Sequence, residues 1–201
     1  QFALQAPTDS ALNLGVIEAK NAAGMFAGTL RHSGDIRVLS ASVDDAGRVI
    51  LAAQKDAILD GSATINVDNA LGRGGSVQIT GERVGLFDAA TVSARGAAGG
   101  GEILVGGDYK GGNPEVRNAT MTYVGPDARL GTGDGGKVIV WADDTARVHG
   151  TIMAPGGFIE TSGKRYLDVG GIRVDAPGGT WLLDPLNIEV VAGSGLVNNG
   201  G

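Results

Sequence analysis

The stretch Gly136-Lys-Val-Ile-Val140 is one copy of a pattern that recurs along the chain: a glycine, any residue, then apolar side chains at alternating positions. The other copies are Gly47-Arg-Val-Ile-Leu, Gly75-Ser-Val-Gln-Ile, Gly101-Glu-Ile-Leu-Val, Gly157-Phe-Ile-Glu-Thr and Gly179-Thr-Trp-Leu-Leu, and the intervals between successive copies are 28, 26, 35, 21 and 22 residues. A period of two is the period of a β-strand, because successive side chains of a strand point to opposite faces. The repeat therefore predicts a strand at each copy.

Further short strands are expected between the copies. A second strand is predicted at Thr64-Ile-Asn-Val, Thr91-Val-Ser-Ala, Ala128-Arg-Leu, Thr151-Ile-Met-Ala and Ile172-Arg-Val-Asp-Ala. A third, shorter apolar piece fills some gaps, as in Ala57-Ile-Leu, Val84-Gly-Leu-Phe and Tyr166-Leu-Asp-Val. Looser copies lie upstream at Gly15-Val-Ile-Glu-Ala, Gly24-Met-Phe-Ala and Gly34-Asp-Ile-Arg-Val. The chain thus reads as about seven or eight units of two or three strands each.

Such units have few ways to bury their apolar faces. One unit alone cannot do so, but a stack pairs each strand with its copy below, about 4.8 Å away. Inward Val, Ile and Leu then form columns along the axis. The predicted fold class is all-β, a parallel β-helix (solenoid) over residues 1–201. A sandwich or propeller needs antiparallel hairpins, and no Asn-Gly or Asp-Gly pair joins two equal strands through a two-residue loop.

The composition agrees with this fold and excludes several classes of function. Glycine is 36 of 201 residues, more than twice the usual share of about 7%, and aromatic residues are only 4%. Without cysteine, disulfides and thiolate metal sites are excluded. The net charge of −6 and the lack of a basic patch argue against a nucleic-acid partner. No apolar run approaches the ~18 residues of a spanning helix, so no membrane insertion is expected.

The longest interval holds an insertion at 106–123, rich in glycine and charge, which predicts a loop leaving the helix body. Its candidate contact residues are Asp108, Tyr109, Lys110, Asn113, Arg117 and Tyr123. In the last copy, Trp181 occupies the repeat position of Val138, so it is expected in the core. Asp184-Pro185 should end that strand, because proline cannot donate to a ladder, and Asp184 should bind backbone amides of the turn.

Several short motifs resemble catalytic or ligand-binding motifs, but the residues around them do not suit that chemistry. Gly131–Lys137 nearly matches a phosphate-binding loop, but Val138 replaces the required Ser or Thr and a strand follows instead of a helix. The adjacent pairs Asp44-Asp45 and Asp143-Asp144 are poorly placed for joint catalysis, because neighbours on a strand face opposite ways. His32 and His149 are expected as isolated surface residues without a metal. We therefore expect no enzyme activity, no cofactor and no metal. Asn118-Ala-Thr120 is a lone glycosylation sequon.

Five blocks in a fixed order carry a resemblance to a known family. They are Gly99-Gly-Gly-Glu-Ile-Leu-Val-Gly-Gly-Asp-Tyr-Lys-Gly111, Thr122-Tyr-Val-Gly-Pro-Asp-Ala128, Gly135-Gly-Lys-Val-Ile-Val-Trp-Ala-Asp-Asp-Thr145, Gly157-Phe-Ile-Glu-Thr-Ser-Gly-Lys164 and Gly178-Gly-Thr-Trp-Leu-Leu-Asp-Pro-Leu-Asn-Ile188. Together with Asn13–Phe26, they resemble the repeat region of filamentous-haemagglutinin-like adhesins, the large secreted partners of two-partner secretion in Gram-negative bacteria. Trp141, Trp181, Asp184 and Pro185 belong to this signature.

The resemblance implies a right-handed β-helix, export through an outer-membrane transporter, and a secreted or cell-surface rod that contacts a receptor or glycan on host cells or other bacteria. The family's Asn-Pro-Asn-Gly stretch is missing, and Asn113-Pro-Glu-Val does not replace it. We therefore expect the chain to lie downstream of the secretion domain that the transporter recognises, stacked end to end on neighbouring rungs. The alternatives are a carbohydrate-active or carbohydrate-binding β-helix and the stalk of a contact-dependent toxin.

Overall fold

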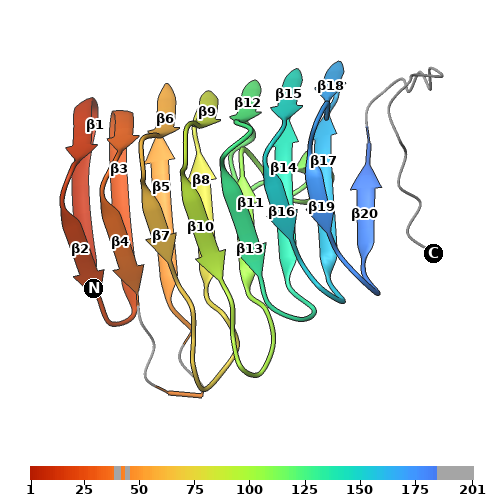
Figure 1. The fold of residues 1–201 in the computed structure, drawn as a ribbon. Helices are drawn as coiled ribbons and strands as arrows, with labels where there is room; N and C mark the ends of the chain where they lie inside the picture. Colours follow the sequence, from red (N-terminus) through yellow and green to blue (C-terminus); the bar gives the residue numbers. More distant parts are fainter. Residues whose placement is uncertain (39–41, 44–45, 185–201) are drawn as a thin grey trace.

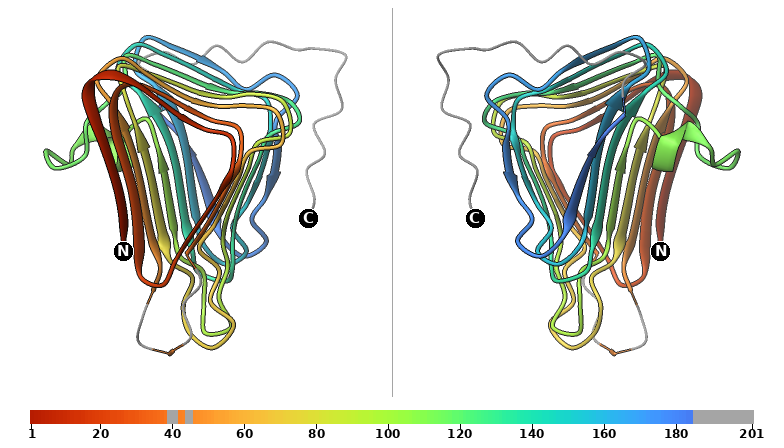
Figure 2. Two further views of the ribbon diagram at one scale, coloured as in Figure 1. Left: turned by 90° about the vertical axis from the view of Figure 1, so that its left-hand side faces the viewer. Right: turned by 90° about the vertical axis from the view of Figure 1, so that its right-hand side faces the viewer.

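The computed structural model describes residues 1–38, 42–43 and 46–184. Within these residues every strand pairing is parallel, in one 13-stranded and one 7-stranded sheet. Figure 1 shows the strands stacked side by side from the N-terminus onward, and Figure 2 shows the same stack end-on, with three walls around one interior. No α-helix occurs in this part of the chain. These curled parallel sheets are consistent with the predicted β-helix.

We name the three walls the first, second and third face. The long strands β1 (Phe2–Asn13) and β3 (Ala22–His32) bend from the first face into the second. The first face continues with β5 (Arg48–Ala53), β8 (Ser76–Thr80), β11 (Glu102–Val105), β14 (Lys137–Ala142), β17 (Phe158–Gly163) and β20 (Thr180–Leu183). The second face holds β6 (Asp56–Leu59), β9 (Arg83–Leu86), β12 (Met121–Val124), β15 (Thr145–Val148) and β18 (Tyr166–Asp168). The third holds β2 (Val16–Ala19), β4 (Asp35–Val38), β7 (Thr64–Asn66), β10 (Thr91–Ala94), β13 (Arg129–Thr132), β16 (Thr151–Met153) and β19 (Arg173–Asp175).

Register alignment turns the repeat into columns of stacked side chains. One inward column of the first face runs Phe2, Ala23, Val49, Val77, Ile103, Val138, Ile159, Trp181. The members from Ala23 to Ile159 are buried, and they belong to one continuous apolar core. The repeat position of Trp181 is therefore confirmed, but the expectation that its side chain lies in the core is wrong. Its side chain is 37% exposed at the last described level, and its indole Nε1–H donates to the hydroxyl of Thr161 at 3.0 Å.

The repeat glycines also stack, one level above the next. The amide that follows each glycine donates to the carbonyl of the glycine below, as from Glu102 to Gly75 and from Lys137 to Gly101. A Cβ atom on Gly101 would lie 1.9 Å from the Gly75 carbonyl oxygen, and one on Gly75 would lie 2.1 Å from that of Gly47. Glycine recurs here because the stacked backbones leave no room for any side chain.

Candidate functional site

The insertion folds back onto the outer side of the first face. Residues 106–120 hold the 3-10 helix η1 (Tyr109–Gly111), and they are followed directly by β12. Val116 of the insertion packs on Leu104, Ile139 and Trp141 of the first face, and together they form a second buried apolar cluster against which Phe158 packs. Trp141 is only 2% exposed, although its strand position points away from the interior. The insertion therefore covers a face that would otherwise expose large apolar side chains, while its tip extends outward (Figure 2).

Polar contacts fix the insertion at both ends of this patch. Arg117 Nη1 donates to the carbonyls of Ala53 and Gln54 at 3.0 and 2.9 Å, at the end of β5. The Lys110 amide donates to the carboxylate of Glu160 on β17, at 3.1 and 3.3 Å from its two oxygens. The insertion thus reaches along the stack from the β5 level to the β17 level.

Glu160 is the buried acid of this cluster, and sequence reasoning missed it. Its side chain faces the insertion and is fully buried, and it accepts a second hydrogen bond from the hydroxyl of Ser162 at 2.9 Å. Burial raises the pKa of Glu160, an effect that these hydrogen bonds only partly offset. A sequence signal for a covered outer face was present nearby. Val138–Ala142 is apolar at every position, the mark of a strand buried on both sides.

Five of the six candidate contact residues lie in the insertion. Asp108 accepts hydrogen bonds from the Tyr109 amide at 2.7 Å, Asn113 Nδ2 at 2.8 Å and Lys137 Nζ at 3.1 Å. Burial acts to raise the pKa of Asp108, but these hydrogen bonds outweigh it and hold that pKa below its usual value. Asp108 therefore organises the insertion. Tyr109 is exposed at its surface, with its ring edge-on to Phe158 at 5.7 Å.

The sixth candidate, Tyr123, lies elsewhere. The structure places Met121–Val124 in strand β12, so the last part of 106–123 belongs to the stack and not to a loop. Tyr123 projects from the second face, where its ring lies 5.0 Å from that of Phe87 and 6.0 Å from that of His149. The six residues therefore do not form one surface.

The remaining acidic and signature residues have structural partners. Asp143 accepts hydrogen bonds from the indole of Trp141 and from Asn118, and it pairs with Lys164, whereas Asp144 pairs with Arg165. Asn118 of the sequon also donates to the Gly111 carbonyl, so its amide nitrogen is engaged within the fold. Asp184 lies 3.9 Å from Lys110 Nζ. Pro185, the turn after Asp184 and the pair at 44–45 lie outside the described residues.

His32 contradicts our expectation of a surface residue. It is fully buried, in the inward column of the second face that runs Asn13, His32, Leu59, Leu86, Val124, Val148. Its Nε2 lies 3.0 Å from the Thr64 carbonyl and therefore donates, which leaves Nδ1 to accept from the Asn13 amide at 3.2 Å. The partners that allow this burial lie far away in the sequence.

The stability of the fold should depend on pH through His32. Burial lowers the pKa of His32 below 6.5, an effect that the Thr64 carbonyl, Asp35 and Asp60 oppose. As the pH falls, the His32 imidazole is therefore protonated in the unfolded chain at a higher pH than in the folded protein. The contribution of neutral, buried His32 to the free energy of unfolding is fully present above pH about 6.5. It is lost below that pH, by at most about 1.4 kcal/mol per pH unit. Urea unfolding at several pH values measures this slope.

Matched variants assign that slope to one residue. His32→Leu, which continues the apolar column, should remove the His32 contribution, whereas His149→Asn should retain it. An unchanged slope in His32→Leu would show that this buried imidazole does not carry the pH dependence.

In the part of the chain that the structure describes, no group of three or more His, Asp or Glu side chains could hold a metal ion. No helix among the described residues has the length and apolarity to cross a membrane. Five hollows on the surface of the described residues are each lined by at most one carboxylate, such as Asp35 on the third face and Asp56 on the second.

The fold and these contacts define an all-β protein of stacked parallel strands with one covered outer patch. Among solved structures, the chain is similar to the crystal structure of the HMW1 secretion domain from Haemophilus influenzae, with 33% sequence identity and a TM-score of 0.79. The alignment covers 87% of this chain and 49% of that one, so the chain spans about half the length of the solved domain. No family model and no curated protein matches the sequence.

This similarity bears on where the chain lies in its parent protein. The solved structure is itself that of a secretion domain. The missing Asn-Pro-Asn-Gly stretch led us to expect a position downstream of such a domain, and the match does not support that expectation. The position of the chain relative to a secretion domain stays a prediction.

Proposed function

We propose that this chain is a structural and interaction segment of a large secreted bacterial adhesin exported by two-partner secretion. It forms a right-handed β-helix of about seven or eight rungs, which at about 4.8 Å per rung gives a rod segment of roughly 35–40 Å. The rod lies in the medium or at the cell surface and attaches the cell to host cells, surfaces or other bacteria. Its partners are an outer-membrane transporter and a surface receptor or glycan.

The observation that carries this proposal is the unbroken parallel ladder on three faces, together with its similarity to a secretion domain. Each level bonds to the level below and buries its apolar side chains against it, so the stack is stiff along its axis. This architecture presents side chains at regular spacing over a long surface. Such a surface suits attachment, because many weak contacts can act together.

We propose that the chain is not an enzyme. Acid–base cleavage of a sugar needs two carboxylates about 5–10 Å apart across a groove. The single carboxylates of the surface hollows and the ion pairs of Asp143 and Asp144 support this view. One of these hollows, on the second face, instead favours the carbohydrate-binding alternative.

Export can be tested in the bacterium that carries the gene. An epitope inserted at Pro114, at the exposed tip of the insertion, should be detected on intact cells or in the medium. Deletion of the neighbouring transporter gene should abolish that signal, while another outer-membrane protein stays at the surface. In-frame deletion of 1–184 should lower adherence to host cells. An epitope that stays inside cells with an intact transporter would contradict the proposal.

A further inference from the structure

A hollow of about 350 Å³ lies on the outer side of the second face. It is lined by Asp56, Ile58, Arg83, Val84, Gly85, Phe87, Met121, Thr122, Tyr123, Thr145 and Arg147. Its centre is Gly85, which stands in register between Ile58 on β6 and Tyr123 on β12. Gly85 has no side chain of its own, and the ring of Phe87 takes up the space above it.

Aromatic rings line this hollow. The Phe87 ring lies back over Gly85, where a Cβ atom would be only 2.3 Å from Phe87 Cε2. The Tyr123 ring stands beside it at 5.0 Å and is tilted by 32°. Phe87 remains 40% exposed and Met121 47% exposed. In a chain with only 4% aromatic residues, an exposed ring beside a half-buried one is an unusual concentration of apolar surface.

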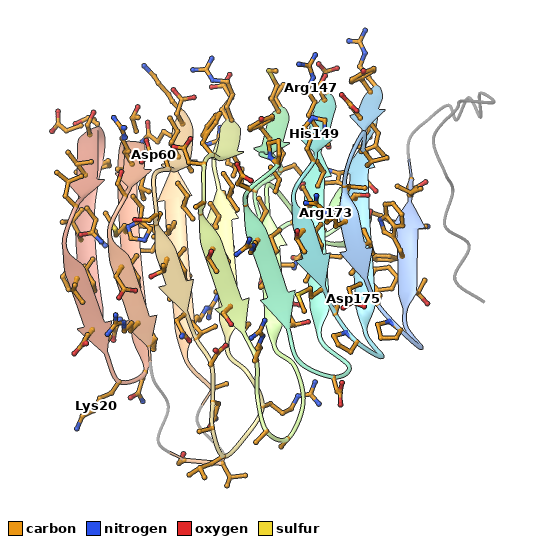
Figure 3. All side chains as sticks on the ribbon, viewed as in Figure 1. Lys20, Asp60, Arg147, His149, Arg173 and Asp175 are labelled. Atoms are coloured by element: carbon orange, nitrogen blue, oxygen red, sulfur yellow. The ribbon has the colours of Figure 1, made fainter. Side chains whose placement is uncertain are left out.

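The rim of the hollow is polar, and one of its two arginines is paired with its carboxylate. Arg83 donates to both carboxylate oxygens of Asp56, at 2.6 and 2.9 Å. Arg147 lies over the Tyr166 ring at 5.9 Å, and its neighbour in register is Asp168 on β18. Arg147 and His149 lie at the same edge of the molecule (Figure 3). The rim thus offers hydrogen-bond donors and acceptors, from one carboxylate and two guanidinium groups.

We propose that this hollow binds a neutral pyranose ring of a cell-surface glycan. A sugar has one face of C–H groups, which packs on aromatic rings, and a ring of hydroxyls, which reach the Asp56–Arg83 pair and Arg147. A lipid chain would bury this charged rim without partners, and a strongly anionic ligand would find Arg83 already paired with Asp56. An extended peptide strand finds no free edge here, because β6, β9 and β12 are each paired on both sides.

The inference rests on the proposed attachment function, since it names the ligand class of that surface. It is tested on purified protein by saturation-transfer NMR, with methyl β-D-galactopyranoside, methyl β-D-glucopyranoside and cellobiose as probes. We expect saturation transfer to the C–H protons of the sugar, with a dissociation constant of the order of 1 mM, as is usual for so small a ligand. Because export plays no part in this assay, its failure would leave the secretion test unaffected.

The structure supplies a matched control for the variants. Phe26 lies over Gly24 on the first face just as Phe87 lies over Gly85, with a Cβ on Gly24 only 2.9 Å from the Phe26 ring. The hollow beside Phe26 has no second ring and no charged side chain. Phe87→Ala and Tyr123→Ala should each weaken sugar binding at least about tenfold, whereas Phe26→Ala should leave it unchanged. Thermal unfolding of all three variants identifies any that fail to fold, and Tyr123→Phe, which keeps the ring, should still bind.

Three results would overturn the inference. The first is no saturation transfer from folded wild-type protein to any of the three probes. The second is equal binding in wild type, Phe87→Ala and Tyr123→Ala. The third is a wild-type protein that binds no sugar but self-associates, with the self-association lost in Phe87→Ala. That result would assign the hollow to contact with a second copy of the chain.

Discussion

A Gly101→Ala variant should lose about 3 kcal/mol or more of its free energy of unfolding, measured by urea denaturation. The added methyl group would stand 1.9 Å from the Gly75 carbonyl oxygen. That oxygen accepts the Glu102 amide, so neither group can move without breaking the ladder between β8 and β11. The contact is with backbone, and no rotamer change can relieve it.

Gly131→Ala provides the control within the same fold. Gly131 also lies in a strand, β13, but a Cβ there would meet only the flexible end of Arg95 at 3.5 Å. This variant should keep its stability within about 0.5 kcal/mol of the wild type or gain slightly, because alanine restricts the unfolded chain. Equal stabilities for the two variants would show that the glycine column is not a packing requirement.

Trp141→Ala should cost about 3–5 kcal/mol of unfolding free energy, the range found for buried Trp truncations. The insertion packs its backbone directly against this ring: a Cβ on Gly111 would lie 2.6 Å from the indole, and one on Gly107 would lie 2.7 Å from it. Lys164 Nζ lies 5.5 Å from the ring on the outer face. Loss of the ring leaves Leu104 and Val116 without their central contact. Trypsin should then cleave the insertion at Lys110 or Arg117 sooner than in the wild type.

Two further variants show whether this effect belongs to the covered patch. Trp141→Phe retains a ring and should lose much less stability than Trp141→Ala. Tyr166→Ala removes an aromatic side chain that is 50% exposed on the second face, and it should cost about 1 kcal/mol or less. A Trp141→Ala protein with wild-type stability and a protected insertion would contradict the anchoring role of the indole.

The stacked fold could be predicted from the sequence because its information is local and repeated. In each strand, the alternation of apolar positions shows which side chains face inward, and it places Val49, Val77 and Ile103 in one column. Parallel pairing follows once one unit stacks on the next. The same logic placed Trp181 in register with Ile159. The position of the insertion followed from one interval that exceeds the others.

The contacts of the insertion could not be predicted in this way. Arg117 binds carbonyls that lie 63 and 64 residues earlier in the chain, and the Lys110 amide binds Glu160, 50 residues later. No periodic pattern encodes such pairs. His32 was misjudged for the same reason, since its burial depends on Asn13 and Thr64, 19 and 32 residues away. The Gly85-x-Phe87 pattern was visible, but only the register showed that Tyr123 stands beside it.

The insertion also changes how this stack should respond to mechanical load. In a simple solenoid each level touches only its neighbours, so tension along the axis peels one level at a time from an end. Here Arg117 holds the β5 level while the Lys110 amide holds the β17 level, so one segment bridges strands that do not touch. Once β20, β19 and β18 have come off, peeling from the C-terminal side must release Glu160 and the Trp141 cluster before the levels below can separate. Force spectroscopy should record this as one large rupture in place of several small ones.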